Sequence, residues 1–445
     1  MKIKVGMISL GCAKNQVDGE VLMGTLKNNG FETVMDPALA DIAIVNTCGF
    51  IDSAKRESIE EILELCTLKK EGKIKKIVVT GCLAERYQRE IHRDIPEVDA
   101  VVGIGANGDI AALLDEMLGG KIVESFPDKY RLPLCGAREL TTPSYFAYLK
   151  IAEGCDNRCT YCAIPEIRGN YRSRPLQNIL EEAEELVKNG AKEIILIAQD
   201  TTRYGIDLYN EYSLPKLLRA LCKIKDLKWI RTLYCYPDVI TDELLAVMAE
   251  EKKVVKYMDI PLQHGSAAVL KAMNRRGDRK SLTALLKKIR EKVPGIILRT
   301  TVIAGFPGET PEDFEELCQF IKEIRFDRLG CFAYSQEEGT VAGAMENQIP
   351  EEEKQHRAEL VTELQMRIMD ENNQRYIGKT LEVLVEGFDR YAECYFGRSY
   401  MDSPDVDGKI FFSAGTKKPA YGQMIKVKIE DAMDADLMGS AVYRT

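Results

Sequence analysis

The chain has 445 residues, of which 45% are hydrophobic and 29% charged, and its formal net charge is −9. This length predicts two or three domains, and the composition excludes a disordered or collagen-like chain. The acidic balance excludes a protein whose whole surface is basic and suited to nucleic acid. No apolar run approaches the roughly 18 residues that span a bilayer. The apolar part of the start, MKIKVGMISLGC, is too short for a signal peptide, so we expect a cytoplasmic protein without a membrane partner.

Residues 1–125 alternate between strand-like and helix-like segments. Apolar runs rich in β-branched residues are separated by helical patterns such as Val17–Asn29 and Ser53–Lys70. The runs are Ile3–Leu10, Ile42–Val45, Ile77–Thr80 and Ala100–Val102. Continuous apolar strands that alternate with helices are typical of a doubly wound parallel sheet, and we predict an α/β domain of that kind. Residues 126–144 contain three prolines and no clear periodicity, which predicts a linker.

Residues 145–350 contain six further strand candidates with helical stretches between them. The candidates are Phe146–Ile151, Glu193–Ala198, Trp229–Tyr236, Val254–Ile260, Ile296–Ala304 and Arg328–Tyr334. Six strand–helix units fall short of the eight units of a complete barrel. We therefore predict a partial, open (β/α)6 barrel for this domain.

The C-terminal part of the chain divides into a helix and a group of short strands. Residues 351–376 are charged and helix-favouring, which predicts a connecting helix. In residues 377–445 the pattern changes to five short alternating strands, with a turn at Asp407-Gly408. Such a succession of short strands is typical of a small antiparallel β-barrel similar to an OB-fold.

The thirteen cysteines are the most informative residues of the chain. Their odd number and the lack of a recognisable export signal argue against a disulfide framework. Cys155, Cys159 and Cys162, here called the loop trio, lie in one CxxxCxxC segment that can hold three irons of a 4Fe–4S cluster and leave the fourth iron open. A zinc loop is the alternative, but zinc is usually closed by four ligands, and no further Cys or His pair follows at a suitable spacing. The segment therefore favours a cluster.

Cys12, Cys48 and Cys82, here called the strand-end trio, each directly follow one apolar strand of the first domain. Ligands of doubly wound sheets bind at the carboxyl ends of strands. These three thiols can therefore lie close together, although they do not form a short sequence motif. Three unrelated buried thiols are the alternative, but that reading does not explain their shared position. We expect a second three-cysteine cluster here. Six of the remaining cysteines fit small buried positions, and Cys135 in the linker has no assigned partner.

Polar or glycine-rich clusters follow three strands of the central domain, at the face where barrel enzymes bind their ligands. They are Gln199-Asp200, Gln263-His264-Gly265 and Gly305-Phe-Pro-Gly308-Glu309. Among them we predict Gln199, Gly305 and Glu309 as cofactor contacts, with ordinary loop chemistry as the alternative for each.

A glycine-rich segment of the first domain, Gly103-Ile-Gly105-Ala-Asn-Gly108, formally matches a dinucleotide-binding fingerprint. It follows the fourth strand rather than the first, and the helix after it is short. We interpret it as a glycine-rich turn.

The CxxxCxxC spacing with an aromatic residue, Tyr161, before the last cysteine resembles the signature of the radical S-adenosylmethionine (SAM) superfamily. That resemblance implies that SAM binds the open iron near Tyr161 and is cleaved to a 5′-deoxyadenosyl radical. The whole chain resembles the methylthiotransferase family, which has an N-terminal three-cysteine domain, a radical SAM core and a C-terminal TRAM domain. The resemblance implies two 4Fe–4S clusters, one on each trio, and two SAM molecules.

Three segments are closer to the branch of that family that modifies a ribosomal protein than to the branch that modifies tRNA. They are SLGCAKNQVDGE, NTCGFIDSAKRESIEE and LKIAEGCDNRCTYCAIPEIRGNYRSR. The tRNA branch has Gln-Met-Asn after its first cysteine, where this chain has Ala13-Lys14-Asn15. Residues 377–445 carry nine Lys and Arg against eleven Asp and Glu, whereas an RNA-binding module should present a positive groove. An acidic module suits a basic ribosomal protein, and we expect no direct binding of nucleic acid.

The resemblance implies a transferase that adds a methylthio group to the β-carbon of an aspartate in small-subunit ribosomal protein twelve. This unreactive carbon calls for a radical route in which the cofactor supplies the difficult step. An external low-potential electron donor and a sulfur donor are the further partners implied. Two alternatives stay open: a tRNA adenosine methylthiotransferase with the same clusters, and a non-enzymatic iron–sulfur carrier or electron-transfer protein.

Overall fold

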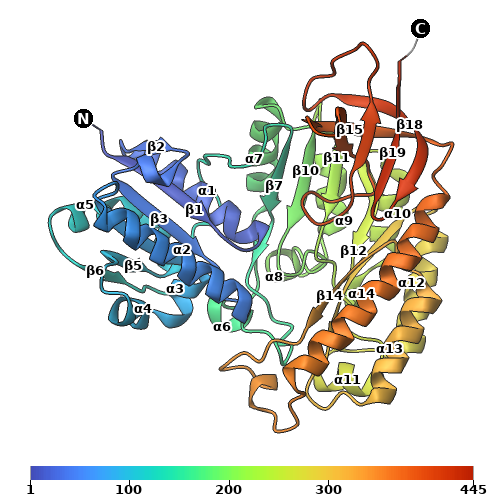
Figure 1. Ribbon diagram of the computed structural model, residues 1–445, viewed down its shortest axis with the longest axis horizontal. Helices are drawn as coiled ribbons and strands as arrows, with labels where there is room; N and C mark the ends of the chain where they lie inside the picture. Colours follow the sequence, from blue (N-terminus) through green and yellow to red (C-terminus); the bar gives the residue numbers. More distant parts are fainter. Residues whose placement is uncertain (1, 444–445) are drawn as a thin grey trace.

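Two parallel sheets and one closed barrel follow one another along the chain in the computed structural model, which describes residues 2–443. Figure 1 shows the first sheet at the left, the second in the centre and the barrel at the upper right. Among the described residues, no helix combines the length and the apolar character needed to cross a membrane.

The first sheet has six parallel strands in the order β2-β1-β3-β4-β5-β6. They are β1 (Lys4–Ser9), β2 (Glu32–Val34), β3 (Ile42–Thr47), β4 (Lys76–Gly81), β5 (Ala100–Val102) and β6 (Val123–Ser125). Helices cover both faces: α1 (Ala13–Asn28) and α5 (Ile110–Leu118) on one, and α2 (Asp52–Lys70), α3 (Cys82–Tyr87) and α4 (Arg89–Asp94) on the other. Ile42 and Ile44 of β3 face α1 and α5, whereas Ala43 and Val45 face α2, as the alternation of a strand requires. The predicted doubly wound sheet is confirmed.

The second sheet has six parallel strands in the order β14-β13-β12-β11-β10-β7. They are β7 (Phe146–Lys150), β10 (Glu193–Ile197), β11 (Trp229–Thr232), β12 (Val254–Asp259), β13 (Ile297–Ala304) and β14 (Arg328–Ala333). The longer outer helices are α7 (Leu176–Lys188), α9 (Leu214–Leu221), α10 (Asp242–Glu250), α12 (Arg279–Lys292) and α13 (Pro311–Ile324). Between them lie α6 (Ile164–Arg168), α8 (Ile206–Tyr209), α11 (Ala267–Ala272) and a short hairpin of β8 (Ala152–Glu153) and β9 (Arg172–Ser173). All six predicted strands are present, and the open partial barrel is confirmed.

The third unit begins with the long helix α14 (Glu351–Gln374), which runs along the open edge of the second sheet beside β14. A closed barrel follows, in the order β15-β16-β17-β19-β18. Its strands are β15 (Thr380–Asp389), β16 (Cys394–Arg398), β17 (Ile410–Ser413), β18 (Met424–Met433) and β19 (Asp436–Val442). The predicted small barrel is confirmed, with the single parallel pair β17–β19 closing it.

Buried ion pairs attach this barrel to the amino ends of the strands of the second sheet. Glu193, the first residue of β10, pairs with Arg231 at 2.7 Å and with Arg398 at 2.8 Å. Arg328, the first residue of β14, pairs with Asp402 at 2.7 Å. The barrel therefore closes one end of the second sheet, and the loops after the strands, which carry the loop trio, stay at the other end.

The glycine-rich segment after β5 forms a short 3-10 turn, Ile104–Asp109. The linker lies directly against it, because a Cβ built on Gly105 would meet the carbonyl oxygen of Asp128 at 2.4 Å. The linker backbone thus packs against the backbone of Gly105. The interpretation of this segment as a turn is confirmed.

Candidate active site

The strand-end trio lies at the carboxyl ends of three neighbouring strands, because β1, β3 and β4 are adjacent in the sheet. The residue before Cys12 contacts Cys48, and Cys82 lies near enough to affect the pKa of Cys48. A Cβ built on Gly11 would lie 2.7 Å from the Cβ of Cys48. Burial, followed by the neighbouring Cys82 thiolate, raises the pKa of Cys48 to about 12. The parallel order of the strands thus brings together three cysteines that are far apart in the chain.

Two cations lie beside this trio. The guanidinium of Arg168, at the end of α6, donates to Cys82 Sγ at 3.2 Å and to Asn15 Oδ1 at 3.1 Å. Lys14 Nζ lies 3.3 Å from the centre of the Tyr234 ring. Loss of solvent by itself raises the pKa of Cys12, but the charges of Lys14 and Arg168 outweigh it and hold that pKa below its ordinary value. A positive environment of this kind favours the thiolate, which is the form that binds metal.

The loop trio lies between the β8–β9 hairpin and α6. The Cys155 backbone N–H donates to the Gly169 carbonyl at 3.1 Å, and Cys162 N–H donates to the Cys159 carbonyl at 3.0 Å, which fixes both ends of the loop. Burial raises the pKa of Cys155 to about 11, and burial together with the nearby Cys159 and Cys155 thiolates raises that of Cys162. Arg275 Nη1 approaches Cys159 Sγ at 3.8 Å. The three thiols therefore share one site.

A cluster on each trio stays a prediction. Zinc needs its donors within about 2.3 Å of one point, whereas a cluster places each thiolate on a different iron and accepts a wider spacing. Among residues 2–443, no group of three His, Cys, Asp or Glu side chains forms a site for a single metal ion.

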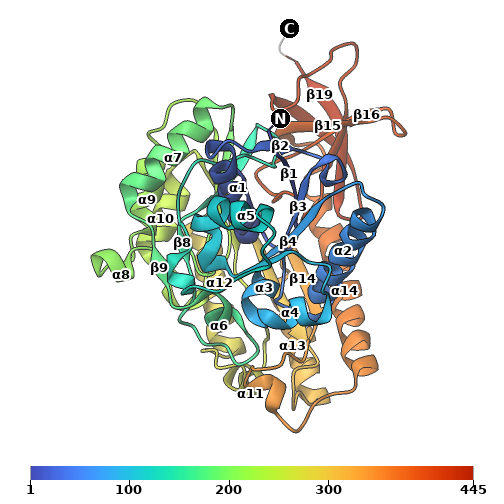
Figure 2. The ribbon, with the colours of Figure 1, turned by 90° about the vertical axis from the view of Figure 1, so that its left-hand side faces the viewer.

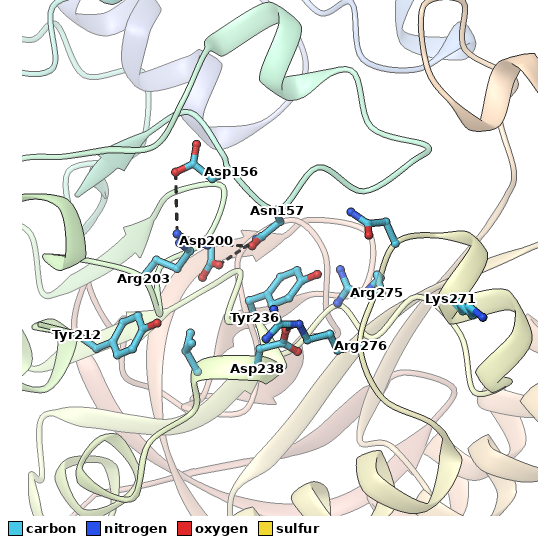
Figure 3. Close-up of a pocket in the computed structure, with 12 residues that line it drawn as sticks. Asp156, Asn157, Asp200, Arg203, Tyr212, Tyr236, Asp238, Lys271, Arg275 and Arg276 are labelled. Carbon is cyan, nitrogen blue, oxygen red and sulfur yellow. Dashed lines mark hydrogen bonds and ion pairs between the residues drawn. The ribbon is translucent and has the colours of Figure 1, made fainter. Parts of the chain in front are cut away.

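A polar cavity of about 400 Å³ opens beside the loop trio (Figure 3). Asn157, inside the CxxxCxxC segment, donates to the Asp200 carboxylate at 3.0 Å, and Tyr236 and Arg275 line the same cavity. Burial raises the pKa of Asp200. The cavity places carboxylates and guanidinium groups together, so it can receive a ligand that carries both an amino and a carboxylate group.

A larger cleft, of about 1210 Å³, is lined by residues of α2, of the ends of β13 and β14, and of α14. Figure 2 shows the ribbons of α2, β14 and α14 next to one another. Phe50, two residues after Cys48, lines it, and so does Tyr161, the neighbour of Cys162. One residue close in sequence to each trio therefore lines this cleft.

The four predicted cofactor contacts have different surroundings. Tyr161 lines the cleft, and Gln199 donates from Nε2 to Glu153 at 3.2 Å while its buried Oε1 has no hydrogen-bond partner. Gly305, at φ +74°, leaves no room for a side chain, because a Cβ there would meet Lys354 Cγ at 2.5 Å. Contact of these residues with a cofactor stays a prediction.

Glu309 uses both carboxylate oxygens within the protein. It accepts hydrogen bonds from Gly305 N–H at 3.0 Å and from Arg357 at 2.7 Å, and His264 Nε2 lies 3.3 Å away. Burial by itself raises the pKa of Glu309, but His264 and Arg357 lower it below its usual value. The carboxylate shapes the loop after β13 and ties it to α14.

A buried network of ion pairs joins the first two domains, and the sequence did not predict it. Lys150 pairs with Asp18 and, at 2.7 Å, with Glu153. Arg168 pairs with Asp18 and, at 3.2 Å, with Glu153. The only sequence signal is a set of charged residues near the cysteines, and their pairing requires the relative position of the two domains.

Replacing Gly11 by alanine should disturb the strand-end trio. The new methyl group would meet Cys48, and Gly11 has a φ of +84°, where a side chain adds strain of about 1–2 kcal/mol. Gly30→Ala is the matched control, since Gly30 has a φ of +93° but nothing within 4 Å of its Cβ position. After anaerobic reconstitution, we expect Gly11→Ala to lose up to about half of its iron and Gly30→Ala to retain it. Equal iron content in the two variants would contradict the placement of Cys48 in a cluster.

Models of three families match successive parts of the chain. The Radical SAM superfamily matches residues 149–321, the TRAM domain matches residues 377–442, and the family described as Uncharacterized protein family UPF0004 matches residues 4–103.

The chain is also similar to curated proteins and solved structures. A protein named ribosomal protein uS12 methylthiotransferase RimO, from Desulforamulus reducens, is 49% identical over 438 residues, with 98% of each chain covered. Its namesake from Caldanaerobacter subterraneus is 50% identical over 436 residues, which cover 98% of this chain and 99% of that protein. The solved structure of the radical SAM methyltransferase TsrM from Kitasatospora setae has a TM-score of 0.59 at 15% identity, with 77% of each chain covered, which is a likeness of fold.

Proposed function

Since the chain belongs to the family of ribosomal protein uS12 methylthiotransferases, we propose that it transfers a methylthio group to the β-carbon of an aspartate of uS12. It is a transferase of the radical SAM type that uses an iron–sulfur cluster and SAM and acts on uS12. The observation that carries the proposal is one cleft lined by residues close in sequence to both trios, in a chain that matches these relatives over nearly its full length.

We further propose two 4Fe–4S clusters, one held by Cys155, Cys159 and Cys162 and the other by Cys12, Cys48 and Cys82. When bound, the clusters and SAM supply the electron, the carbon-centred radical and the methylated sulfur that side chains alone cannot provide. Lys14 and Arg168 stabilise the thiolate of Cys12 through their positive charge. An external low-potential reductant and a sulfur donor complete the proposal.

The polar cavity beside the loop trio supports a role in binding SAM. Asp200 can accept hydrogen bonds from the SAM amino group, and Arg275 can pair with its carboxylate, which gives the zwitterionic end of the cofactor two complementary partners. Tyr161 and the free amide oxygen of Gln199 are the further contacts we propose. Gly305 and Glu309 would act by holding the loop after β13 in place.

A tRNA methylthiotransferase is the nearest alternative to this proposal. The acidic balance of residues 377–445 and the names of the relatives both favour a protein substrate. An electron carrier is the alternative of another class, and it does not need a cleft of about 1210 Å³ lined by residues close to both trios.

Mass spectrometry of uS12 from cells with and without the gene tests the proposed function. We expect the mass of one methylthio group on a uS12 aspartate with the gene, and unmodified uS12 without it. The tRNA nucleosides of the same cells are the control, and they should be identical in the two strains. A methylthio group that disappears from tRNA instead would assign the chain to the alternative reaction.

A further inference from the structure

The outer wall of the large cleft is one face of α14. Glu351, Gln355, Glu359, Thr362 and Glu363 line the cleft from this helix. Their spacing of three and four residues places them on one side of an α-helix. In Figure 2, α14 lies beside α2, whose first turn forms the facing wall.

The charges of this cleft are unbalanced. One carboxylate of its lining, Glu337, pairs with Lys55 at 3.0 Å and with Arg86 at 2.8 Å. The other four carboxylates of the lining stand against two cations, Arg56 and Lys354. Both cations are already engaged within the protein: Arg56 pairs with Asp52 at 2.7 Å, and Lys354 pairs with Glu351 at 2.9 Å.

Glu359 and Glu363 stand four residues apart on the exposed side of α14. Within residues 2–443, their side chains make no ion pair and no hydrogen bond. Like charges at this spacing are unfavourable for a helix. This pair is therefore free to receive positive charge from a partner.

Polar groups of the protein also face the cleft without partners. Within the part of the chain that the structure describes, the Oε1 atom of Gln263 and the hydroxyl of Tyr334 are buried without a hydrogen-bond partner, and both residues line the cleft. Gln263 has a φ of +73° and is held there by two backbone hydrogen bonds to the end of β13, at 2.9 and 2.8 Å. Strained backbone of this kind is usual at ligand-binding positions. Phe332, 54% exposed, adds an apolar surface to the same cleft.

The size of the cleft points to a polypeptide rather than to a small molecule alone. Small-molecule sites occupy about 300–1000 Å³. This cleft has about 1210 Å³ and joins an acidic helix face to the region of the two trios. Ribosomal proteins bind the RNA polyanion and are basic for that reason, so their charge complements α14, whereas a nucleic acid would be repelled by it.

We propose that a Lys- and Arg-rich segment of uS12 binds along α14, with Glu359 and Glu363 pairing with its basic side chains, and places the target aspartate inside the cleft. This inference rests on the proposed function and adds to it the surface that recognises the substrate. Gln263 and Tyr334 then offer hydrogen bonds to the bound backbone.

A double charge reversal, Glu359→Lys with Glu363→Lys, tests this surface. The matched control is Glu181→Lys with Glu185→Lys, which makes the same charge change at the same spacing on an exposed stretch of α7, away from the cleft. Anaerobically reconstituted enzyme is titrated with labelled, purified uS12 at about 50 mM salt, and anisotropy reports binding. We expect the α14 variant to bind roughly tenfold more weakly or worse, and the α7 control to bind like the wild type. Iron content and circular dichroism establish that both variants are folded.

The milder pair Glu359→Gln with Glu363→Gln preserves side-chain shape and should give an intermediate loss of affinity. Its difference from the wild type should shrink as salt rises, because exposed charges are screened. If wild-type enzyme modifies uS12 and the α14 reversal binds it as tightly as the α7 control, the inference is wrong and the proposed function stands. If the wild type neither binds nor modifies uS12, the proposed function itself fails. Competition for this cleft by a tRNA anticodon stem-loop would also overturn the inference.

Discussion

We expect the Cys155→Ala variant to form no 5′-deoxyadenosine from SAM and to leave uS12 unmodified, whereas Cys12→Ala should still form 5′-deoxyadenosine and yet leave uS12 unmodified. The structure separates the two residues by domain: Cys155 belongs to the loop beside the polar cavity, and Cys12 lies at the end of β1. A cluster that has lost one of three protein ligands should not assemble stably. Each variant should therefore lose one site and retain the other.

Anaerobic reconstitution followed by iron determination and chromatography of the nucleoside product checks both variants. Wild-type protein should hold about eight irons and each variant about four. Cys135→Ala is the control, because Cys135 is an exposed linker cysteine outside both trios. If the Cys12→Ala variant still modified uS12, the strand-end trio would not be needed for methylthio transfer, and the separate roles of the two trios would be refuted. A wild type with only about four irons would refute the second cluster.

The convergence of the strand-end trio is predictable because it follows from a rule of topology. Parallel strands that are neighbours in a sheet end at the same edge, so residues that directly follow them meet there. Cys12, Cys48 and Cys82 follow β1, β3 and β4, which are adjacent in the observed order. The short edge strands β2 and β6 could not be predicted, because each contains polar residues and is partly exposed. The equally short β5 is wholly apolar and buried, and its apolar run is visible in the sequence.

What the sequence does not reveal is how separate elements meet. Lys150 and Asp18 are 132 residues apart, and neither position has a feature that indicates a buried ion pair. The same holds for α14, whose charges are typical of a solvated helix until the cleft beside it is seen. Glu309 is a related case: its place in a loop after a strand suggests a ligand contact, but its role in the structure is set by His264 and Arg357, which come from other elements.

Replacing Arg168 by methionine should destabilise the protein strongly. Arg168 is 1% exposed and joins α6 of the second domain to Asp18 and Asn15 of α1. Removing it leaves two buried carboxylates, Asp18 and Glu153, with Lys150 as their single cation. Removing one member of a buried ion pair lowers the free energy of unfolding by about 3–5 kcal/mol, because the remaining charge stays desolvated without a partner. We expect a loss of that size in the free energy of unfolding, measured by urea titration of the reconstituted protein.

Two further variants separate the charge of Arg168 from its shape and its burial. Arg168→Lys retains the positive charge and should recover most of the stability, although a single ammonium cannot reproduce the forked contact with Asn15 and Cys82. Arg131→Met removes an exposed guanidinium paired with Asp109 at 2.7 Å and should cost less than about 1 kcal/mol. If Arg168→Met and Arg131→Met lose equal stability, the buried network does not hold the two domains together.

The pH dependence of the same variant gives an independent check on the charge argument. Burial by itself raises the pKa of Glu153, but Lys150 and Arg168 outweigh it and hold that pKa well below its usual value. In the wild type, the contribution of this carboxylate to the free energy of unfolding is therefore lost only in strong acid. Without Arg168 we expect burial to outweigh the remaining charge of Lys150 and to raise the pKa of Glu153 above its unfolded value. Such a carboxyl stabilises the protein at low pH and loses that effect as the pH increases. The stability deficit of Arg168→Met should accordingly be larger at about pH 8 than at about pH 5, and a deficit that is the same at both would show that lost packing, rather than lost charge, is its cause.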